Sequence, residues 1–253
     1  DDMSEFKPIT ENQKLAVEAW DEGDNLILSG SAGTGKTFLA ISLGLEDVLD
    51  KETEYEKLTI VRSIVPTRDI GFLPGNEEEK KDAYTAPYRG ILTEIFQDKL
   101  AWQKLTVANA IDFESTSFIR GVTFRDTIII VDEMQNLTFH ELDSVITRIG
   151  ENCKIIFCGD FHQSDFRFED ERDGLPKFIN LIEQLKDFST INFDWKDIVR
   201  SGIVRACFCP KSGLHPAHIR RWEGVLIFLI STVLDGSKIN GCTTPLASWC
   251  SRA

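Results

Sequence analysis

Apolar residues along this chain gather in short continuous runs, and longer segments with a helical alternation of apolar and polar positions separate the runs. The run 128–131 is a series of β-branched residues, which is typical of a strand buried on both faces of a sheet. Segment 9–20 places its apolar residues three and four positions apart, which is typical of an amphipathic helix. The chain therefore contains strand-like apolar runs and helical apolar patterns, in separate segments.

Predicted strands and helices alternate along most of the chain. The predicted strands are 26–29, 57–62, 105–108, 127–133, 154–158 and 190–193. The predicted helices are 9–20, 36–49, 91–100, 138–149, 174–185 and 194–204, with capping signals at Thr10 and Thr138. Segment 63–88 holds three prolines and two glycines and is predicted to be an irregular functional loop. The alternation predicts an α/β fold, with a mostly parallel central sheet flanked by helices on both faces.

Composition adds limits on partners and location. A hydrophobic content of 42% is enough for a sizeable core. The formal net charge of -13 excludes a uniformly basic surface for nucleic acid but leaves room for a local basic groove. The opening residues show no secretory-signal pattern, and the longest apolar run, 225–234, is too short to cross a bilayer as a helix. We therefore expect a cytoplasmic protein without a membrane partner.

The composition changes after position 205. Acidic residues become rare there, while cysteines and histidines accumulate at Cys207, Cys209, His215 and His218. Their spacing matches none of the usual structural zinc sites, so we do not predict a zinc ion. The sequence predicts one domain over 1–205 and a divergent tail of unknown structure over 206–253.

The segment GSAGTGKT, residues 30–37, follows the first predicted strand and opens the next predicted helix. This is the context of a phosphate-binding loop, or P-loop, in which glycines let backbone N–H groups approach a polyphosphate. Lys36 is expected to reach the terminal phosphates, and Thr37 is expected to bind Mg²⁺. The predicted phosphate-binding residues are Gly30, Ser31, Ala32, Gly33, Thr34, Gly35, Lys36 and Thr37. A P-loop NTPase is therefore the predicted form of the α/β fold.

Two carboxylates follow the predicted strand 127–133 at its end. Ligands of open parallel sheets bind beyond the carboxyl ends of the strands, so Asp132 and Glu133 are expected beside the P-loop. Asp132 suits the Mg²⁺ site that Thr37 begins. Glu133 is placed to act as general base on an attacking water.

Three further polar residues are candidates for the hydrolytic site. Gln163 follows the predicted strand 154–158 within a GDxxQ string, and its amide suits a contact with the terminal phosphate or the attacking water. Arg148 and Arg200 are candidate arginine fingers, within the chain or across a subunit interface, although a solvated arginine is the commoner case.

Taken together, these residues resemble the PhoH family of P-loop ATPases, which is related to superfamily 1 helicases. The matching pieces are GSAGTGKT at 30–37, RSIVPTRDIGFLPGNEEEK at 62–80, FIRGVTF at 118–124, IIIVDEMQN at 128–136, LDSVITRIG at 142–150, FCGDFHQSD at 157–165 and DIVRSGIVR at 197–205. Within the family the chain looks most like phage-encoded members, because Ser63 follows Arg62 where many bacterial members have proline.

The resemblance implies that the chain binds and hydrolyses ATP with Mg²⁺. It also implies that Gln13 contacts adenine, as in helicase-like enzymes, and that Arg148 or Arg200 acts as the finger. Some members of the family form rings and some act on RNA. We therefore expect a homo-oligomer, with a ring as one form, and RNA or single-stranded DNA as candidate partners.

A second class of function fits the same residues. In a nucleotide-switched interaction protein, ATP binding would reorder the segment 63–75, and turnover would be incidental. A kinase is disfavoured, because no acceptor pocket or lid is identifiable in the sequence. The two acidic residues and Gln163 also suit activation of water better than activation of an acceptor hydroxyl.

Overall fold

The structure is a computed structural model that describes Met3, residues 6–63, 77–117, Ile119, 121–160 and 174–198, apart from the side chains of 77–80. All of them lie within one compact unit, Asp1–Ser201. The predicted tail 206–253 lies outside the described residues. Among the helices described, none combines the length and the apolar character needed to cross a membrane.

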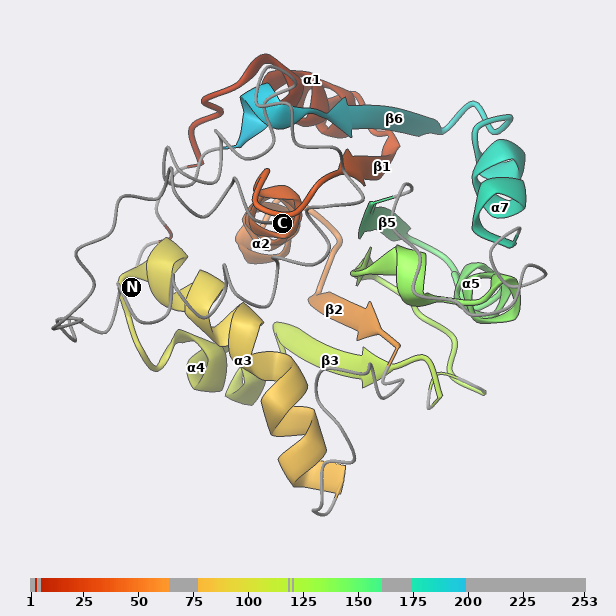
Figure 1. Ribbon diagram of the computed structural model, residues 1–253. Helices are drawn as coiled ribbons and strands as arrows, with labels where there is room; N and C mark the ends of the chain where they lie inside the picture. Colours follow the sequence, from red (N-terminus) through yellow and green to blue (C-terminus); the bar gives the residue numbers. More distant parts are fainter. Residues whose placement is uncertain are drawn as a thin grey trace, which may run out of the picture. The chain divides into compact units, whose positions relative to one another are not determined.

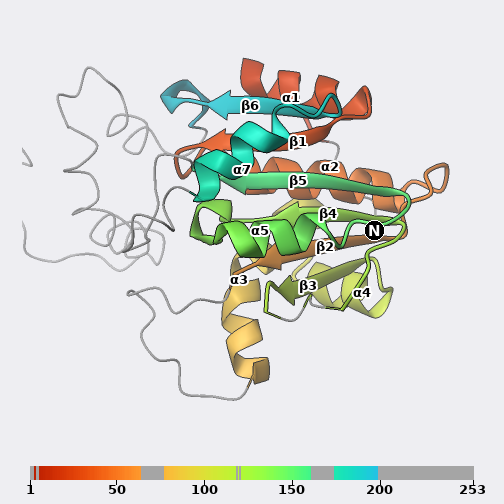
Figure 2. The ribbon, with the colours of Figure 1, turned by 90° about the vertical axis from the view of Figure 1, so that its right-hand side faces the viewer.

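The described strands form one parallel sheet in the order β3-β2-β4-β5-β1-β6, and Figure 2 shows them running in the same direction. The strands are β1 (Asn25–Gly30), β2 (Lys57–Arg62), β3 (Ile111–Ser115), β4 (Thr127–Val131), β5 (Cys153–Gly159) and β6 (Phe188–Phe193). Strands of a parallel sheet present their carboxyl ends at one edge. The predicted α/β class is confirmed.

Helices cover both faces of the sheet, as Figure 1 shows: α1 to α4 pack on one face, and α5 and α7 pack on the other. The helices are α1 (Glu11–Asp21), α2 (Lys36–Leu49), α3 (Glu77–Phe96), α4 (Ala101–Val107), α5 (Phe139–Ile146) and α7 (Gly174–Ile182), with short 3-10 turns η1 (Met134–Asn136) and η2 (Trp195–Asp197). Each face of the sheet therefore has its own hydrophobic core.

The central strand β4 contributes to both cores, because all of its residues are buried. Ile128 and Ile130 pack on the α2 side, and Ile129 and Val131 pack on the α5 side. A Cβ added to Gly44 of α2 would lie 2.7 Å from a methyl group of Leu58, so glycine at this position lets α2 pack close to the sheet.

Helix α3 begins at Glu77, inside the segment that the sequence predicts to be irregular, and the prediction is wrong there. Pro87 lies within the helix and removes one backbone donor. The helix forms because Tyr84, Tyr88, Leu92 and Ile95 recur at helical spacing and are buried against the sheet. Tertiary burial outweighs the cost of the proline at this position.

Two further predictions at the β3 edge are wrong. Residues 105–108 belong mostly to α4 rather than to a strand, since Leu105 is buried while Val107 is 89% exposed. Strand β3 was not predicted, because Asp112 and Glu114 interrupt its apolar residues. Such alternation is typical of an edge strand with one buried face. Of the predicted helix 194–204, the described part contains only η2, and residues beyond Ile198 lie outside the described residues.

Candidate active site

The turn from β1 into α2 depends on glycine at defined positions. Gly30 has φ +149°, and a Cβ there would lie 2.4 Å from the backbone oxygen of Phe193 on β6. Gly33 and Gly35 have φ of 86° and 83°, a region that side chains with a Cβ rarely adopt. The GSAGTGKT segment thus folds as a tight loop whose last glycine directly precedes the first turn of α2.

Lys36 turns back into this loop. Its amine donates to the backbone oxygen of Ser31 at 2.8 Å, to that of Gly30, and to Thr34 Oγ1 at 3.2 Å. Burial lowers the pKa of Lys36, while the neighbouring acidic residues Asp160, Glu133 and Asp132 act in the opposite direction. The amine is thus held at the centre of the loop, close to the acidic ends of β4 and β5.

The P-loop and the acidic end of β4 meet directly. The Thr37 hydroxyl donates to Oδ1 of Asp132 at 2.9 Å, although β5 separates β1 from β4 in the sheet. The N-terminus of α2 spans this distance, because α2 crosses the sheet from β1 towards β4 and β2. The expected meeting of the two segments is present in the structure.

Glu133 adopts a left-handed backbone conformation, with φ 52° and ψ 44°, directly after β4. A residue with a Cβ in this region carries a cost of about 1 kcal/mol or more, and such residues gather at functional sites. Burial, followed by the charge of Asp132, raises the pKa of Glu133. The backbone turn therefore directs a desolvated carboxylate to the same edge of the sheet as the P-loop.

Gln135 holds Glu133 in place. Its amide nitrogen donates to Oε2 of Glu133, and its amide oxygen accepts from the backbone N–H of Asp160 at 3.2 Å. Gly159 makes room for it, since a Cβ there would lie 2.6 Å from the Gln135 oxygen. Gln135 therefore links the acidic end of β4 to the end of β5.

The oxygen atoms at this site suit a magnesium ion. Mg²⁺ prefers hard oxygen ligands, and it is usually held by one or two protein groups together with phosphates and water. The Thr37 hydroxyl and the Asp132 carboxylate supply such oxygens side by side. In the part of the chain that the structure describes, no group of three or more His, Cys, Asp or Glu residues could hold a metal by itself. The donor set therefore fits Mg²⁺ shared with a phosphate ligand.

A model of the PhoH-like protein family matches residues 5–209 of the sequence. The chain belongs to this family. The expected family and the P-loop NTPase form of the fold are thereby confirmed, and the specific likeness to phage-encoded members stays a prediction.

Several curated PhoH-like proteins are similar to this chain. Protein PhoH2 of Bacillus subtilis is 39% identical over 171 residues, which cover 65% of this chain and 38% of that protein. A PhoH-like protein of Mycobacterium leprae is 32% identical over 199 residues, which cover 78% of this chain and 56% of that protein. This PhoH-like chain thus spans about half or less of the length of these relatives.

Solved structures of lower similarity include a large terminase and a helicase. The large terminase of a thermophilic bacteriophage, in a complex with ADP, is 13% identical with a TM-score of 0.45, covering 85% of this chain and 50% of that one. The Pif1 helicase of Candida albicans is 19% identical with a TM-score of 0.35, covering 74% of this chain and 40% of that one.

Of the remaining predicted site residues, the structure describes Gln13 and Arg148. Gln13 is buried in α1, where its side-chain oxygen accepts from the backbone N–H of Ile9 at 2.8 Å and completes a capping box with Thr10. Its structural role is thus helix capping, and its contact with adenine stays a prediction. Gln163 and Arg200 lie outside the described residues.

The backbone of Arg148 lies away from the P-loop edge of the sheet. It follows α5, and its backbone oxygen accepts from Phe124 just before β4 begins. Strands β4 and β5 begin at that edge, whereas the P-loop lies at their carboxyl ends. The backbone of Arg148 thus lies at the opposite edge of the sheet from the P-loop, and a finger role within its own chain stays a prediction. A finger role across a subunit interface stays a prediction.

Three residues near the acidic pair were not predicted from the sequence to have a role in the site. Gln135 holds Glu133, Tyr88 donates to Asp132, and Arg62 adds a cation beside both carboxylates. Gln135 and Arg62 lie inside two segments that resemble the family, IIIVDEMQN and RSIVPTRDIGFLPGNEEEK. The sequence therefore marked both segments but indicated no role for these two residues. Tyr88 carried no signal, because its helix was not predicted.

Glu141 joins the ends of two strands to the start of α5. Ser63 and Thr116 donate to its Oε1 at 3.1 and 2.7 Å, and the backbone and hydroxyl of Thr138 donate to its Oε2 at 2.9 and 3.0 Å. Burial acts to raise the pKa of Glu141, but these hydrogen bonds outweigh it and lower the pKa. The predicted capping box of Thr138 is confirmed and forms part of a larger network.

Replacing Glu141 with Gln is expected to lower the free energy of unfolding at pH 7 by about 1–2 kcal/mol, because charge-assisted hydrogen bonds are lost. A carboxyl with a depressed pKa contributes stability above its unfolded value near 4.5, and this contribution is lost as the pH falls through the folded pKa. The difference between wild type and variant should therefore shrink in acid. Urea denaturation at neutral and acidic pH measures it, with exposed Asp143→Asn as control. A difference that grows in acid would contradict the network.

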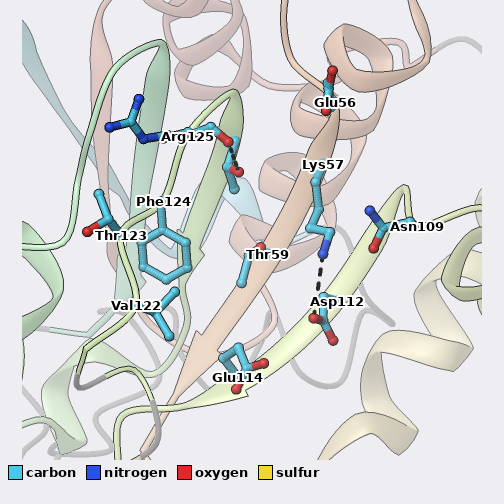
Figure 3. A pocket seen from close by; sticks show the side chains of 11 residues that line it. Glu56, Lys57, Thr59, Asn109, Asp112, Glu114, Val122, Thr123, Phe124 and Arg125 are labelled. Atoms are coloured by element: carbon cyan, nitrogen blue, oxygen red, sulfur yellow. Dashed lines mark hydrogen bonds and ion pairs between the residues drawn. The ribbon is translucent and has the colours of Figure 1, made fainter.

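A hollow of about 320 Å³ lies away from this site, where β2, β3 and β4 begin (Figure 3). Figure 3 shows Lys57 of β2 pointing toward Asp112 of β3, and their charged atoms are 3.8 Å apart. The segment 122–125 lines its other side. Burial, followed by the charge of Asp112, raises the pKa of Glu114 in the same hollow. No P-loop residue lines it, so it is separate from the candidate active site.

Proposed function

We propose that this PhoH-like chain is a Mg²⁺-dependent ATPase. The observation that carries the proposal is the 2.9 Å hydrogen bond from Thr37 to Asp132, which joins the phosphate-binding loop to the carboxylate expected at the metal. Membership of the PhoH-like family supports nucleotide binding. The desolvated carboxylate of Glu133, the residue after Asp132, supports hydrolysis rather than binding alone.

The residues of the chain divide the reaction between them. The backbone N–H groups of 30–37 and the N-terminus of α2 bind the phosphates, and Lys36 neutralises charge on the terminal oxygens. Thr37 and Asp132 would hold Mg²⁺, and the ion would neutralise negative charge on the phosphates. Glu133 orients an attacking water and accepts its proton, with Gln135 fixing the carboxylate.

Phosphate release from ATP tests the proposal directly. The purified chain should release inorganic phosphate with Mg²⁺ and should stop when EDTA removes the ion. If the chain binds nucleotide but releases no phosphate under any condition and with any added nucleic acid, the proposed hydrolysis is contradicted. If it binds no nucleotide, the whole ATPase proposal is contradicted.

Gln135→Leu is expected to lower kcat by about tenfold or more while leaving nucleotide affinity close to that of wild type. The leucine keeps the bulk of the side chain but donates nothing to Glu133 and accepts nothing from Asp160. Steady-state kinetics separates the two parameters. As a control, Gln184→Leu changes an exposed glutamine whose amide nitrogen donates to the Asn180 carbonyl oxygen one turn earlier. A rise in KM with unchanged kcat would contradict the role given to Gln135.

Coupling to RNA or single-stranded DNA is a further part of the proposal, and it rests on the resemblance to helicase-like enzymes. Stimulation of phosphate release by either nucleic acid at low salt supports coupling, and lack of both binding and stimulation rejects it. The adenine contact of Gln13 and an assembly such as a ring belong to the same proposal. The particle mass in the presence and absence of ATP tests the assembly.

The nucleotide-switched interaction protein is the second candidate function. It is supported by Ser63, which begins the segment 63–75 and is bonded to Glu141 beside the site. In this case ATP binding, rather than turnover, controls a partner. A Glu133→Gln protein that binds ATP without hydrolysing it should then still engage that partner. Loss of engagement in this variant would favour a function driven by turnover.

A further inference from the structure

The carboxylate of Asp132 is held by two hydroxyl groups, one on each oxygen. Thr37 donates to Oδ1 at 2.9 Å, and Tyr88 donates to Oδ2 at 2.8 Å. Asp132 is only 5% exposed, so little water competes for either oxygen. A carboxylate with a fixed donor on each oxygen cannot rotate without breaking a hydrogen bond. Two residues therefore set its orientation, and the P-loop supplies only one of them.

Tyr88 reaches Asp132 from the middle of α3. Its side chain is 0% exposed, and its ring packs against Phe113 of β3 with the ring centroids 6.0 Å apart. An ionised carboxylate can only accept hydrogen bonds, so the Tyr88 hydroxyl is the donor in its contact with Asp132.

A cation completes this cluster. Arg62 lies at the end of β2, the strand next to β4, and its guanidinium carbon is 5.9 Å from the centre of the Tyr84 ring. Burial acts to lower the pKa of Arg62, but Tyr88, Asp132 and Glu133 outweigh it and raise the pKa. The hydrogen bond from Tyr88 to Asp132 is thus buried beside the Arg62 cation and the Asp132 and Glu133 carboxylates. In such a buried network each hydrogen bond is stronger than it would be in water.

We propose that Tyr88 is a positioning residue for the metal carboxylate, holding Asp132 in the orientation in which it faces Thr37 and Mg²⁺. The inference rests on the proposed ATPase function, because that function assigns Mg²⁺ to Asp132. Without the Tyr88 hydroxyl, no side chain among the described residues donates a hydrogen bond to Oδ2, and the carboxylate is free to turn away from Thr37. Binding of Mg²⁺ must then restore the orientation, which weakens the apparent affinity for the ion.

The matched variants are Tyr88→Phe and Tyr84→Phe. Both keep a buried aromatic ring on the same face of α3, but only the first removes a hydroxyl that is bonded to Asp132. The experiment follows the binding of a fluorescent ADP derivative by anisotropy during a Mg²⁺ titration, and repeats the binding in EDTA. Phosphate release from ATP is measured over the same titration, and thermal melting of each variant checks the fold.

The expected result is that Tyr88→Phe needs about tenfold more Mg²⁺ for half-maximal ADP binding and phosphate release. Its affinity for ADP in EDTA and its melting should match those of wild type, and Tyr84→Phe should behave as wild type throughout. A wild-type Mg²⁺ dependence in Tyr88→Phe would overturn the inference. Loss of folding or of binding in EDTA would also overturn it, since Tyr88 would then be structural. If wild type binds ADP with Mg²⁺ but hydrolyses nothing, the ATPase proposal fails separately.

Discussion

Lys36→Ala is expected to lower kcat for ATP hydrolysis by about a thousandfold. The amine is the one P-loop cation that can follow charge onto the terminal phosphate oxygens, and alanine leaves this charge unopposed. In the structure the amine is bonded to loop oxygens of Gly30 and Ser31, so a bound phosphate has to replace these partners. Phosphate release under saturating ATP measures the loss.

The control for Lys36 is Lys14→Ala, which removes an exposed lysine of α1 that is 3.6 Å from Glu11. It should hydrolyse ATP as wild type does. Lys36 also supports the loop through its hydrogen bonds, so thermal melting of both variants separates loss of charge from loss of fold. Activity of Lys36→Ala within about tenfold of wild type would place hydrolysis elsewhere in the chain.

Glu133→Gln is expected to lower kcat by about a hundredfold or more while nucleotide affinity changes by less than about threefold. Glutamine has the same size and still bonds a water, but its amide cannot accept the proton. Since Gln135 holds Glu133 from one side, the water has to approach the remaining carboxylate oxygen. Single-turnover kinetics with ATP measures the chemical step directly.

Glu151→Gln is the matched control, because Glu151 is exposed and its ion-pair partner in the described part of the chain is Arg125, at 3.0 Å. It should leave both turnover and nucleotide binding unchanged. Undiminished hydrolysis in Glu133→Gln would assign the proton to another acceptor. Joint loss of binding and turnover would point to a structural role at the turn after β4, where Glu133 has its left-handed backbone.

The elements that the sequence predicted well are those with a strong local signal. The P-loop turn, β4 and the helix cap at Thr138 each carry their pattern within a few residues. Local geometry dictates such segments, because glycine conformations, buried β-branched runs and capping hydrogen bonds form between near neighbours. From these signals the sequence predicted that the P-loop and the carboxyl ends of the neighbouring strands lie at the same edge of the sheet.

The elements that the sequence predicted poorly depend on distant partners. Helix α3 contains a proline and a charged first turn, and burial of its aromatic face, with Tyr88 packed on Phe113 of β3, makes it stable. Strand β3 is an edge strand whose polar alternation looks like a loop. In both cases the stabilising contacts come from residues far along the chain, which no local pattern records.

By itself, the sequence determined the α/β class, the family and the residues of the P-loop and the acidic pair, because these follow from short motifs and periodicity. Only the tertiary structure decided that Tyr88 and Thr37 share Asp132, that Gln135 holds Glu133, and that Arg148 lies at the far edge. These contacts depend on how helices cross the sheet and on which strands are neighbours. The spacing of residues along the chain does not determine which strands are neighbours or where the helices cross, because packing of the whole core determines both.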